Sequence, residues 1–457
     1  MDMNGQMDAL LAEAEKLSAG EHFRERIVSE IFQAAENITR QVVRKKQVKR
    51  DWEQKLDNLL TSRLFGFPIM MGLLGVVLWL TVEGANYPSE LLASLLFGLE
   101  GHLSNLLASL NAPSWLHGAL VDGIYRTMAW VISVMLPPMA IFFPMFTFFE
   151  DLGYLPRVAF NLDRLFKGAG AAGKQALTMC MGLGCNAAGV TACRIIDSPR
   201  ERLIAILTNN FIPCNGRFPL FIALGTIFFK RLADVGSFGA SLVILTLVGF
   251  GVLITLFISW LLSRTILKGV PSAFTLELPP YRKPQIGTIL VRSLLDRTLH
   301  VLGRAVVVAA PAGLITWILA NTSLGGATLL ARLAGFLEPL GRLAGLDGFI
   351  LAAFILGMPA NEIVLPILLM GYLSQGVMLE PTSVEVLGKI LLQNGWTVLT
   401  GLNMMLFSLL HFPCGTTLLT IKKETGSRKW TLISFLLPSA VAFAACVLTA
   451  QVARVFW

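Results

Sequence analysis

The stretch Gly182-Leu183-Gly184-Cys185-Asn186 lies inside a hydrophobic segment, and the pair Pro213-Cys214 interrupts the hydrophobic segment that follows. Two glycines, a thiol and a carboxamide side by side predict a membrane helix that is broken at this point. Broken backbone at membrane depth is tolerated only where protein or a water-filled cavity satisfies its polar groups. Membrane proteins bind small solutes at such breaks, and a thiol beside an amide oxygen favours a metal ion as that solute.

The composition around this stretch is that of a membrane protein. Of the 457 residues, 54% are hydrophobic and only 14% are charged, whereas a soluble domain has about 25% charged residues. Several runs reach the ~20 apolar residues that a membrane-spanning helix needs. We therefore predict an all-α polytopic membrane protein with about seven to nine membrane segments. The start is not a signal peptide, because acidic residues such as Asp8 and Glu13 stand where an apolar core is required.

The net charge of +8 reflects orientation in a lipid bilayer rather than nucleic-acid binding, since the basic residues fall in short loops beside the spans. No Lys or Arg occurs between Arg63 and Arg126, which places residues 84–125 outside and the N-terminus in the cytoplasm. The six cysteines all lie in or next to apolar segments, so a disulfide framework is excluded. No HExxH motif supports zinc-enzyme chemistry.

The charge and hydrophobicity patterns divide the chain into four parts. Residues 1–60 are a basic, helical cytoplasmic extension, 61–262 a first membrane half, 263–298 a cytoplasmic linker and 299–457 a second membrane half. We expect residues 91–110 to form one or two amphipathic helices at the membrane interface. Segment 175–193 is flanked by basic residues on both sides, so we expect it to re-enter on one side, and the C-terminus then lies outside. The expected spans are 64–82, 127–149, 203–228, 237–262, 299–319, 389–420 and 431–455.

The two halves carry the same motifs. Gly182 and Asn186 are matched by Gly357 and Asn361, and a Pro-Cys pair ends at Cys214 and again at Cys414. The loop charges give the halves opposite directions, which is the pattern of an inverted repeat with a site between the halves. The spacing differs, because Cys214 is 28 residues after Asn186 whereas Cys414 is 53 residues after Asn361. Chance similarity between apolar segments is the alternative.

Three cysteines at Gly or Pro breaks are the candidate metal ligands. Thiolates suit the softer first-row cations, and amide or carboxylate oxygens complete the ligand shell. Glu362 is the strongest acidic candidate, because an ionisable group inside a membrane segment is costly. A single buried cysteine is as often a packing group, and we assign Cys180, Cys193 and Cys446 to packing. The predicted metal site consists of Cys185, Asn186, Cys214, Asn361, Glu362 and Cys414.

Other polar groups leave two interpretations open. Glu150 and Asp151 are either a gate at the inner end of the second span or an ordinary solvated helix end. Asn209 and Asn210 suit interhelical hydrogen bonding as well as ion contact.

Gly168 to Lys174 matches GxxxxGK, but Gln175 replaces the Ser or Thr of a P-loop and no soluble strand-loop-helix context surrounds it. We therefore expect no nucleotide site and no enzyme activity in this chain.

The chain resembles the membrane domain of the ferrous iron transport protein B family over about residues 50–457. The resemblance rests on the stretch from Glu150 to Arg164, on Gly182 to Asn186, and on Arg200-Glu201-Arg202-Leu203. Pro213 to Pro219, Phe412-Pro413-Cys414 and Lys422 to Ser427 complete it. It implies two gate-type repeats and uptake of Fe²⁺ across the prokaryotic inner membrane. In such a protein Fe²⁺ is the transported substrate and no cofactor is permanently bound. The gate cysteines of the family carry over onto Cys185, Cys214 and Cys414.

Two departures from the family keep alternatives open. The family begins with a GTP-binding domain, and residues 1–60 are too short for one. Either a separate small GTPase or a small cytoplasmic accessory subunit would then act on the chain, or the chain would work without such a partner. The second gate has Asn361-Glu362 where the family has Lys-Glu, so Mn²⁺ or a broader divalent-metal substrate stays open. The further alternatives are a nucleoside-type carrier using the asparagines and a scaffold that recruits a GTPase through residues 1–60. The oligomeric state is open, a homo-oligomer included.

Overall fold

The computed structural model describes residues 23–42, 51–62, 64–228, 237–269, 281, 284–374, 376–378 and 384–456. Parts of the expected extension, 1–22 and 43–50, and most of linker residues 270–283 lie outside the described residues. Seven helices in the described ranges are long and apolar enough to cross a membrane, and a bent helix pair would make an eighth. The prediction of an all-α polytopic membrane protein is confirmed.

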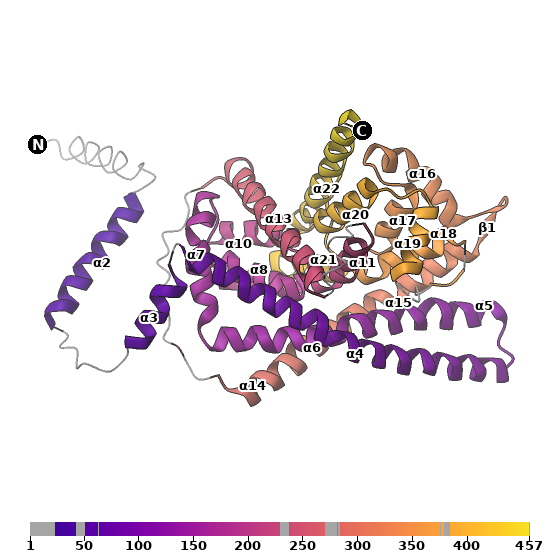
Figure 1. Ribbon diagram of the computed structural model, residues 1–457, viewed down its shortest axis with the longest axis horizontal. Helices are drawn as coiled ribbons and strands as arrows, with labels where there is room; N and C mark the ends of the chain where they lie inside the picture. Colours follow the sequence, from indigo (N-terminus) through magenta and orange to yellow (C-terminus); the bar gives the residue numbers. More distant parts are fainter. Residues whose placement is uncertain are drawn as a thin grey trace, which may run out of the picture.

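The first half begins with two extension helices and a long helical hairpin (Figure 1). A bilayer core is about 30 Å thick, whereas the 44 residues of α4 span about 66 Å. The prediction of separate interfacial helices at 91–110 is therefore wrong. That segment continues α4 through Pro88, and α4 packs against η1 and α6. The elements are α2 (Phe23–Val42), α3 (Asp51–Leu60), α4 (Gly66–Ser109), α5 (Ser114–His117), the π-helical η1 (Gly118–Tyr125) and α6 (Arg126–Asp151).

Short helices follow in the first gate region, and a single long helix closes the half. The expected span 203–228 is divided, because its backbone leaves the helix around Ile212 and Cys214. The elements are α7 (Tyr154–Gly168), α8 (Gln175–Gly184), α9 (Asn186–Ala192), η2 (Cys193–Ile195), α10 (Pro199–Thr208), η3 (Asn209–Phe211), η4 (Asn215–Arg217), α11 (Phe218–Phe228) and α13 (Ser237–Arg264).

The second half repeats this order after a short connecting segment. Its elements are α14 (Ile286–Val291), the π-helical η5 (Arg292–Leu299), α15 (His300–Asn321), strands β1 (Ser323–Leu324) and β2 (Ala327–Thr328), α16 (Leu329–Leu343) and α17 (Gly348–Leu356). They continue with η6 (Asn361–Ile363), α18 (Val364–Tyr372), α19 (Val384–Gln393), α20 (Val398–Leu410), α21 (Gly415–Thr425) and α22 (Arg428–Phe456). The strands form a two-stranded antiparallel hairpin with Ser323 opposite Thr328.

The second half also shows elements that the expected spans did not include. Residues 320–348, which lie between two expected spans, contain the amphipathic helix α16, which meets α17 at a bend of 113°. The expected span 389–420 is interrupted twice, once at Gly395, whose φ is +80°, and again before Cys414. Helix α19 has no counterpart in the first half, and its insertion accounts for the longer spacing between the second pair of motifs.

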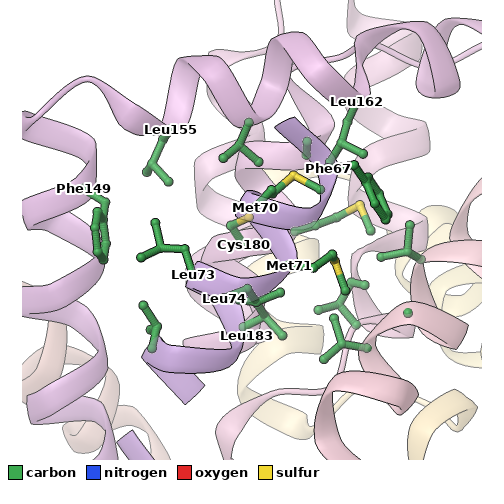
Figure 2. A pocket seen from close by; sticks show the side chains of 18 of the residues that line it. Phe67, Met70, Met71, Leu73, Leu74, Phe149, Leu155, Leu162, Cys180 and Leu183 are labelled. Atoms are coloured by element: carbon green, nitrogen blue, oxygen red, sulfur yellow. The ribbon is translucent and has the colours of Figure 1, made fainter. Parts of the chain in front are cut away.

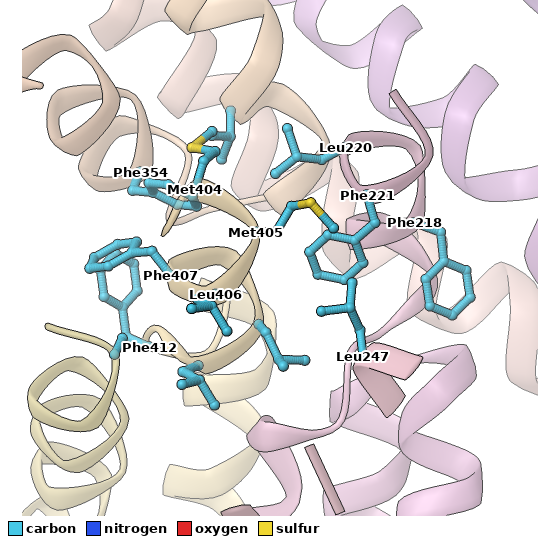
Figure 3. Close-up of a cluster of buried hydrophobic side chains, with 14 of the residues drawn as sticks. Phe218, Leu220, Phe221, Leu247, Phe354, Met404, Met405, Leu406, Phe407 and Phe412 are labelled. Carbon is cyan, nitrogen blue, oxygen red and sulfur yellow. The ribbon is translucent and has the colours of Figure 1, made fainter. Parts of the chain in front are cut away.

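Buried hydrophobic side chains join the two halves. Figure 3 shows Phe221 of α11 beside Met405 of α20, and Met404 of α20 beside Phe354 of α17, and all four are at most 3% exposed. Phe354 of α17 contacts Phe407, with ring centroids 4.8 Å apart. Aromatic side chains contribute most to such contacts, because each buries a large apolar area. This core holds the broken segments of both halves against one another.

An apolar pocket lies between α4, α6, α7, α8 and α13. Figure 2 shows Met70, Met71 and Leu74 of α4 facing the pocket together with Leu183 of α8. Its volume is ≈ 420 Å³. Cavities without polar groups stay dry, so the pocket is a hydrophobic space beside the first gate helix.

Asp57 of the extension connects three separate segments. Its carboxylate accepts hydrogen bonds from Arg157 Nε at 3.1 Å and Nη2 at 3.3 Å, and from the Tyr281 hydroxyl at 2.7 Å. The Arg157 guanidinium also stacks on the Tyr281 ring at 4.2 Å. Burial alone raises the pKa of Asp57, but the Arg157 and Tyr281 hydrogen bonds outweigh it and hold that pKa below 3.8. The extension helix α3, the first half and the linker between the halves are thereby held together.

Candidate functional site

The structure brings all six predicted metal-site residues around one cavity. Cys185 and Asn186 come from the first break, Cys214 from the second, Asn361 and Glu362 from the third and Cys414 from the fourth. The cavity measures ≈ 30 Å³, and a water molecule needs at least about 10–15 Å³ by this measure. A space of this size suits an ion with little of its hydration shell.

Each lining cysteine sits where an extended residue separates two helical segments. Cys185 has φ −156° and ψ 126°, and Ala360 has nearly the same angles, −149° and 121°. Cys214 and Cys414 are likewise extended, with ψ of 165° and 160°. The matched angles identify Ala360 as the second-half equivalent of Cys185. A thiol in the first half is therefore replaced by a methyl group in the second.

Close contacts explain the glycines at these breaks. A Cβ added to Gly184 would lie 2.7 Å from Phe142, and one added to Gly216 would lie 1.9 Å from the Glu362 Oε1 atom. The backbone of η4 therefore approaches the carboxylate more closely than any side chain would allow. Only glycine permits such an approach, so Gly216 gives Glu362 its place beside the cavity.

Hydrogen bonds between segments fix the remaining groups. Asn361 Nδ2 lies 3.7 Å from the Cys214 sulfur, and Trp130 Nε1 donates to the Glu362 carbonyl oxygen at 3.2 Å. The Cys414 thiol lies 3.2 Å from the Thr417 hydroxyl. The Asn361 Oδ1 atom is buried and has no hydrogen-bond partner in the described part of the chain. A buried oxygen without a partner is costly, and a cation in the cavity would satisfy it.

The donor set is rich in sulfur but is not a closed metal centre. Among the described residues, no group of three His, Cys, Asp or Glu side chains is close enough to hold a metal ion. Thiolate sulfur favours softer first-row cations, and the Glu362 carboxylate and the amide oxygens add hard donors. Helical segments follow Cys214 and Cys414 directly, and a helix N-terminus stabilises negative charge on nearby groups. The arrangement suits transient contact with a passing cation.

The other predicted polar groups lie elsewhere. Glu150 and Asp151 are exposed at the end of α6 and do not line the cavity, so a gating role stays a prediction. Asn209 donates to the Asn186 carbonyl oxygen at 3.2 Å, in agreement with the interhelical hydrogen-bonding interpretation. The GxxxxGK segment follows helix α7 rather than a strand, and Lys174 pairs with Asp197 at 2.7 Å. The P-loop arrangement is therefore absent from these described residues.

Sequence reasoning missed the buried charge next to the cavity. Arg217 is 1% exposed and belongs to η4, three residues after Cys214. The signal was present, because an arginine inside an apolar run is a functional candidate in a membrane protein. The thioethers of Met135 and Met139, which also line the cavity, were missed because methionine in an apolar span has no distinguishing pattern.

Comparisons with known proteins agree with this arrangement. The family model described as "Nucleoside recognition" (Gate) matches residues 132–228 and 302–428, which contain all four breaks. The model described as "Ferrous iron transport protein B C terminus" matches residues 244–296. No solved structure matches this chain.

Curated relatives match most of the chain. The Fe(2+) transporter FeoB of Staphylococcus aureus (strain MSSA476) is 28% identical over 420 residues, covering 89% of this chain and 60% of the relative. The Fe(2+) transporter FeoB of Methanocaldococcus jannaschii is 28% identical over 422 residues with the same coverage. A Porphyromonas gingivalis protein named as a fusion of Fe(2+) transport protein A with Fe(2+) transporter FeoB is 23% identical over 450 residues, covering 88% of this chain and 52% of the relative.

The chain thus spans about 60% of the length of the first two relatives. The matched residues include both gate halves and the segment between them. This chain belongs to the ferrous iron transport protein B family and corresponds to its membrane part.

Proposed function

We propose that this chain forms the path by which Fe²⁺ crosses the prokaryotic inner membrane. The observation that carries the proposal is the cavity between the halves, which is lined by three thiols, one carboxylate and three carboxamides. Fe²⁺ accepts both sulfur and oxygen donors. The positive-inside pattern supports a cytoplasmic N-terminus, and the names of the relatives support ferrous iron as the substrate.

The geometry suggests how the ion is handled. Fe²⁺ loses water as it enters a cavity of ≈ 30 Å³, and sulfur and oxygen atoms replace that water. Thiols must lose their protons to act as ligands, so binding releases protons. Because no three of these groups form a closed centre among the described residues, a complete ligand set does not enclose the ion, and it can move on. Conduction requires this balance, since a site that binds too tightly does not release its ion.

The cavity argues against the nucleoside alternative. Pockets for organic ligands measure about 300–1,000 Å³, whereas this cavity is far smaller. Mn²⁺ remains the closest competing substrate, and it prefers oxygen donors. Three cysteines on one cavity therefore favour Fe²⁺ over Mn²⁺.

Uptake of Fe²⁺ into proteoliposomes under reducing, anaerobic conditions tests the proposal. We expect Cys185→Ser and Cys214→Ser to lower the uptake rate at least tenfold, on the order of the loss seen when metal-site groups are changed. Cys446→Ser is the matched control, because Cys446 is fully buried in α22 away from the cavity. Uptake by both cavity variants at the wild-type rate would refute the site, and preferential uptake of Mn²⁺ would refute the choice of ion.

We also propose that a GTPase or a small accessory protein acts on the chain from the cytoplasm. The extension helix α3 contacts α7 through Asp57 and Arg157, and α7 packs on α8, which ends at the first break. A relative named as a fusion with Fe(2+) transport protein A supports the accessory protein. Deleting residues 1–60 should abolish stimulation by such a partner while basal uptake persists, and loss of basal uptake in a folded deletion variant would contradict this.

A further inference from the structure

Arg217 carries a fixed positive charge next to the proposed iron path, and every acceptor that the described residues offer it is uncharged. Its Nη1 atom donates to the carbonyl oxygens of Asn210 at 3.2 Å and Leu409 at 2.8 Å. Its Nη2 atom donates to the Asn210 side-chain oxygen at 3.2 Å. Its Nε atom is buried and has no partner among the described residues. Burying a charge destabilises a protein, so a buried arginine inside a membrane segment is a candidate for a functional role.

The surroundings of Arg217 connect it to the cavity. Residue 216 is the glycine that contacts the Glu362 carboxylate, and Asn215 on the same turn lines the cavity. The charge of Arg217 interacts electrostatically with Cys214, Cys414 and Glu362. Three of the proposed iron contacts therefore experience a positive charge from inside the protein.

Hydrogen bonds fix the position of this charge. Asn210 donates to the His411 carbonyl oxygen and contacts the Asn186 carboxamide at 3.2 Å. Leu409 and His411 belong to the segment that leads to Cys414. The guanidinium is thus held by backbone from both halves, and it cannot turn away when a cation enters.

We propose that Arg217 is a specificity-determining residue whose charge limits how tightly the cavity holds a divalent cation. This inference rests on the proposed function. Thiolates and a carboxylate in a confined, water-poor space bind a soft divalent cation strongly, and conduction fails when the ion cannot leave. A fixed positive charge weakens that binding. Because Coulomb repulsion grows in proportion to the charge of the ion, it also disfavours trivalent ions more than divalent ones.

The test is the affinity and transport rate of the full chain with Fe²⁺ under anaerobic conditions. Arg217→Gln removes the charge, so we expect the Kd for Fe²⁺ to fall by about tenfold or more, while the maximal uptake rate falls as release slows. Arg217→Lys keeps the charge but loses the planar fork of hydrogen bonds, so we expect its Kd to stay closer to the wild type than that of Arg217→Gln. Weaker Fe²⁺ binding in Arg217→Gln would overturn the inference: it would show a structural role if Arg217→Lys also binds more weakly, and a charge that assists loss of the thiol protons if Arg217→Lys binds normally.

A second variant covers failure of Arg217→Gln to fold. Asn215→Asp adds a negative charge to the cavity wall with little change of shape and leaves the hydrogen bonds of Arg217 in place. It should also lower the Kd for Fe²⁺ and slow the maximal rate, and an unchanged or higher Kd would refute the charge-balance account. If the wild-type protein neither binds nor transports Fe²⁺, the proposed function fails. Wild-type transport together with weaker binding by Arg217→Gln refutes only the inference about Arg217.

Discussion

Replacing Gly216 by alanine should move the Glu362 carboxylate while leaving the fold intact. The added Cβ would lie 1.9 Å from Oε1 and 2.5 Å from the carboxyl carbon, whereas ordinary contact begins at 3.4 Å. The carboxylate must therefore shift by about 1.5 Å, several times the ±0.2 Å tolerance of a metal–ligand distance. Because the obstacle is the flexible end of a side chain, the cost to folding stays within about 1 kcal/mol.

We expect Gly216→Ala to reduce Fe²⁺ uptake into proteoliposomes by about 10- to 100-fold, the range found when groups around a metal are disturbed. Gly303→Ala is the matched control, since Gly303 lies in the membrane helix α15 and an added Cβ there meets nothing within 4 Å. Thermal unfolding of both variants should match the wild type within a few degrees. Wild-type uptake by a folded Gly216→Ala protein would show that the position of the carboxylate does not matter and would remove Glu362 from the path.

Three further outcomes are expected. Asp57→Asn should weaken the attachment of α3 by about 1.5–3 kcal/mol, because a charged hydrogen-bond acceptor is lost. Amide exchange in residues 51–60 should then be faster than in the wild type, and unchanged exchange would contradict this prediction. The folded pKa of Asp57 lies below its ordinary value of 3.8, so its contribution is complete above that pH and is lost as the pH falls through the lower folded value. The protection of the α3 amides, corrected for the slower intrinsic exchange at low pH, should therefore fall in wild type as the pH drops below 3.8 but fall less in Asp57→Asn, and an equal fall would point to other groups. Ala360→Cys adds a thiol at the position equivalent to Cys185 and should tighten Cd²⁺ binding by about tenfold in a direct titration, whereas weaker binding would argue that the Ala360 Cβ points away from the cavity.

The helix breaks were readable from the sequence because Gly, Pro and Asn are unusual inside apolar runs. The same signals gave six of the residues that line the cavity. The insertion α19 was partly readable, since Asn394-Gly395 marks a turn inside a segment assigned to one span. Helix α16 was also accessible, because Leu330, Ala334, Leu337 and Gly341 recur at helical spacing and are buried.

Other features depend on contacts that no local pattern contains. The acceptors of Arg217 include the carbonyl oxygen of Leu409, 192 residues away. The continuity of α4 was missed because Glu83, Pro88 and Glu90 are typical of an interface, and its pairing with the α5–α6 arm outweighs them. The repeated motif already places Cys185 and Ala360 before matching asparagines, and their backbone angles show that the two residues also share one extended conformation.

The apolar pocket of Figure 2 gives α8 neighbouring space that can be compressed, and this sets α8 apart from its counterpart α17. Helix α8 borders ≈ 420 Å³ of space through Ala176, Met179 and Leu183, whereas its counterpart α17 packs Phe354 against Phe407 with ring centroids 4.8 Å apart. A close-packed interior resists displacement, and a void allows a helix to shift without moving its neighbours. Hydrostatic pressure disfavours states with voids, so it should favour a closer approach of α8 to α4. We therefore expect pressure to displace the first break before the second.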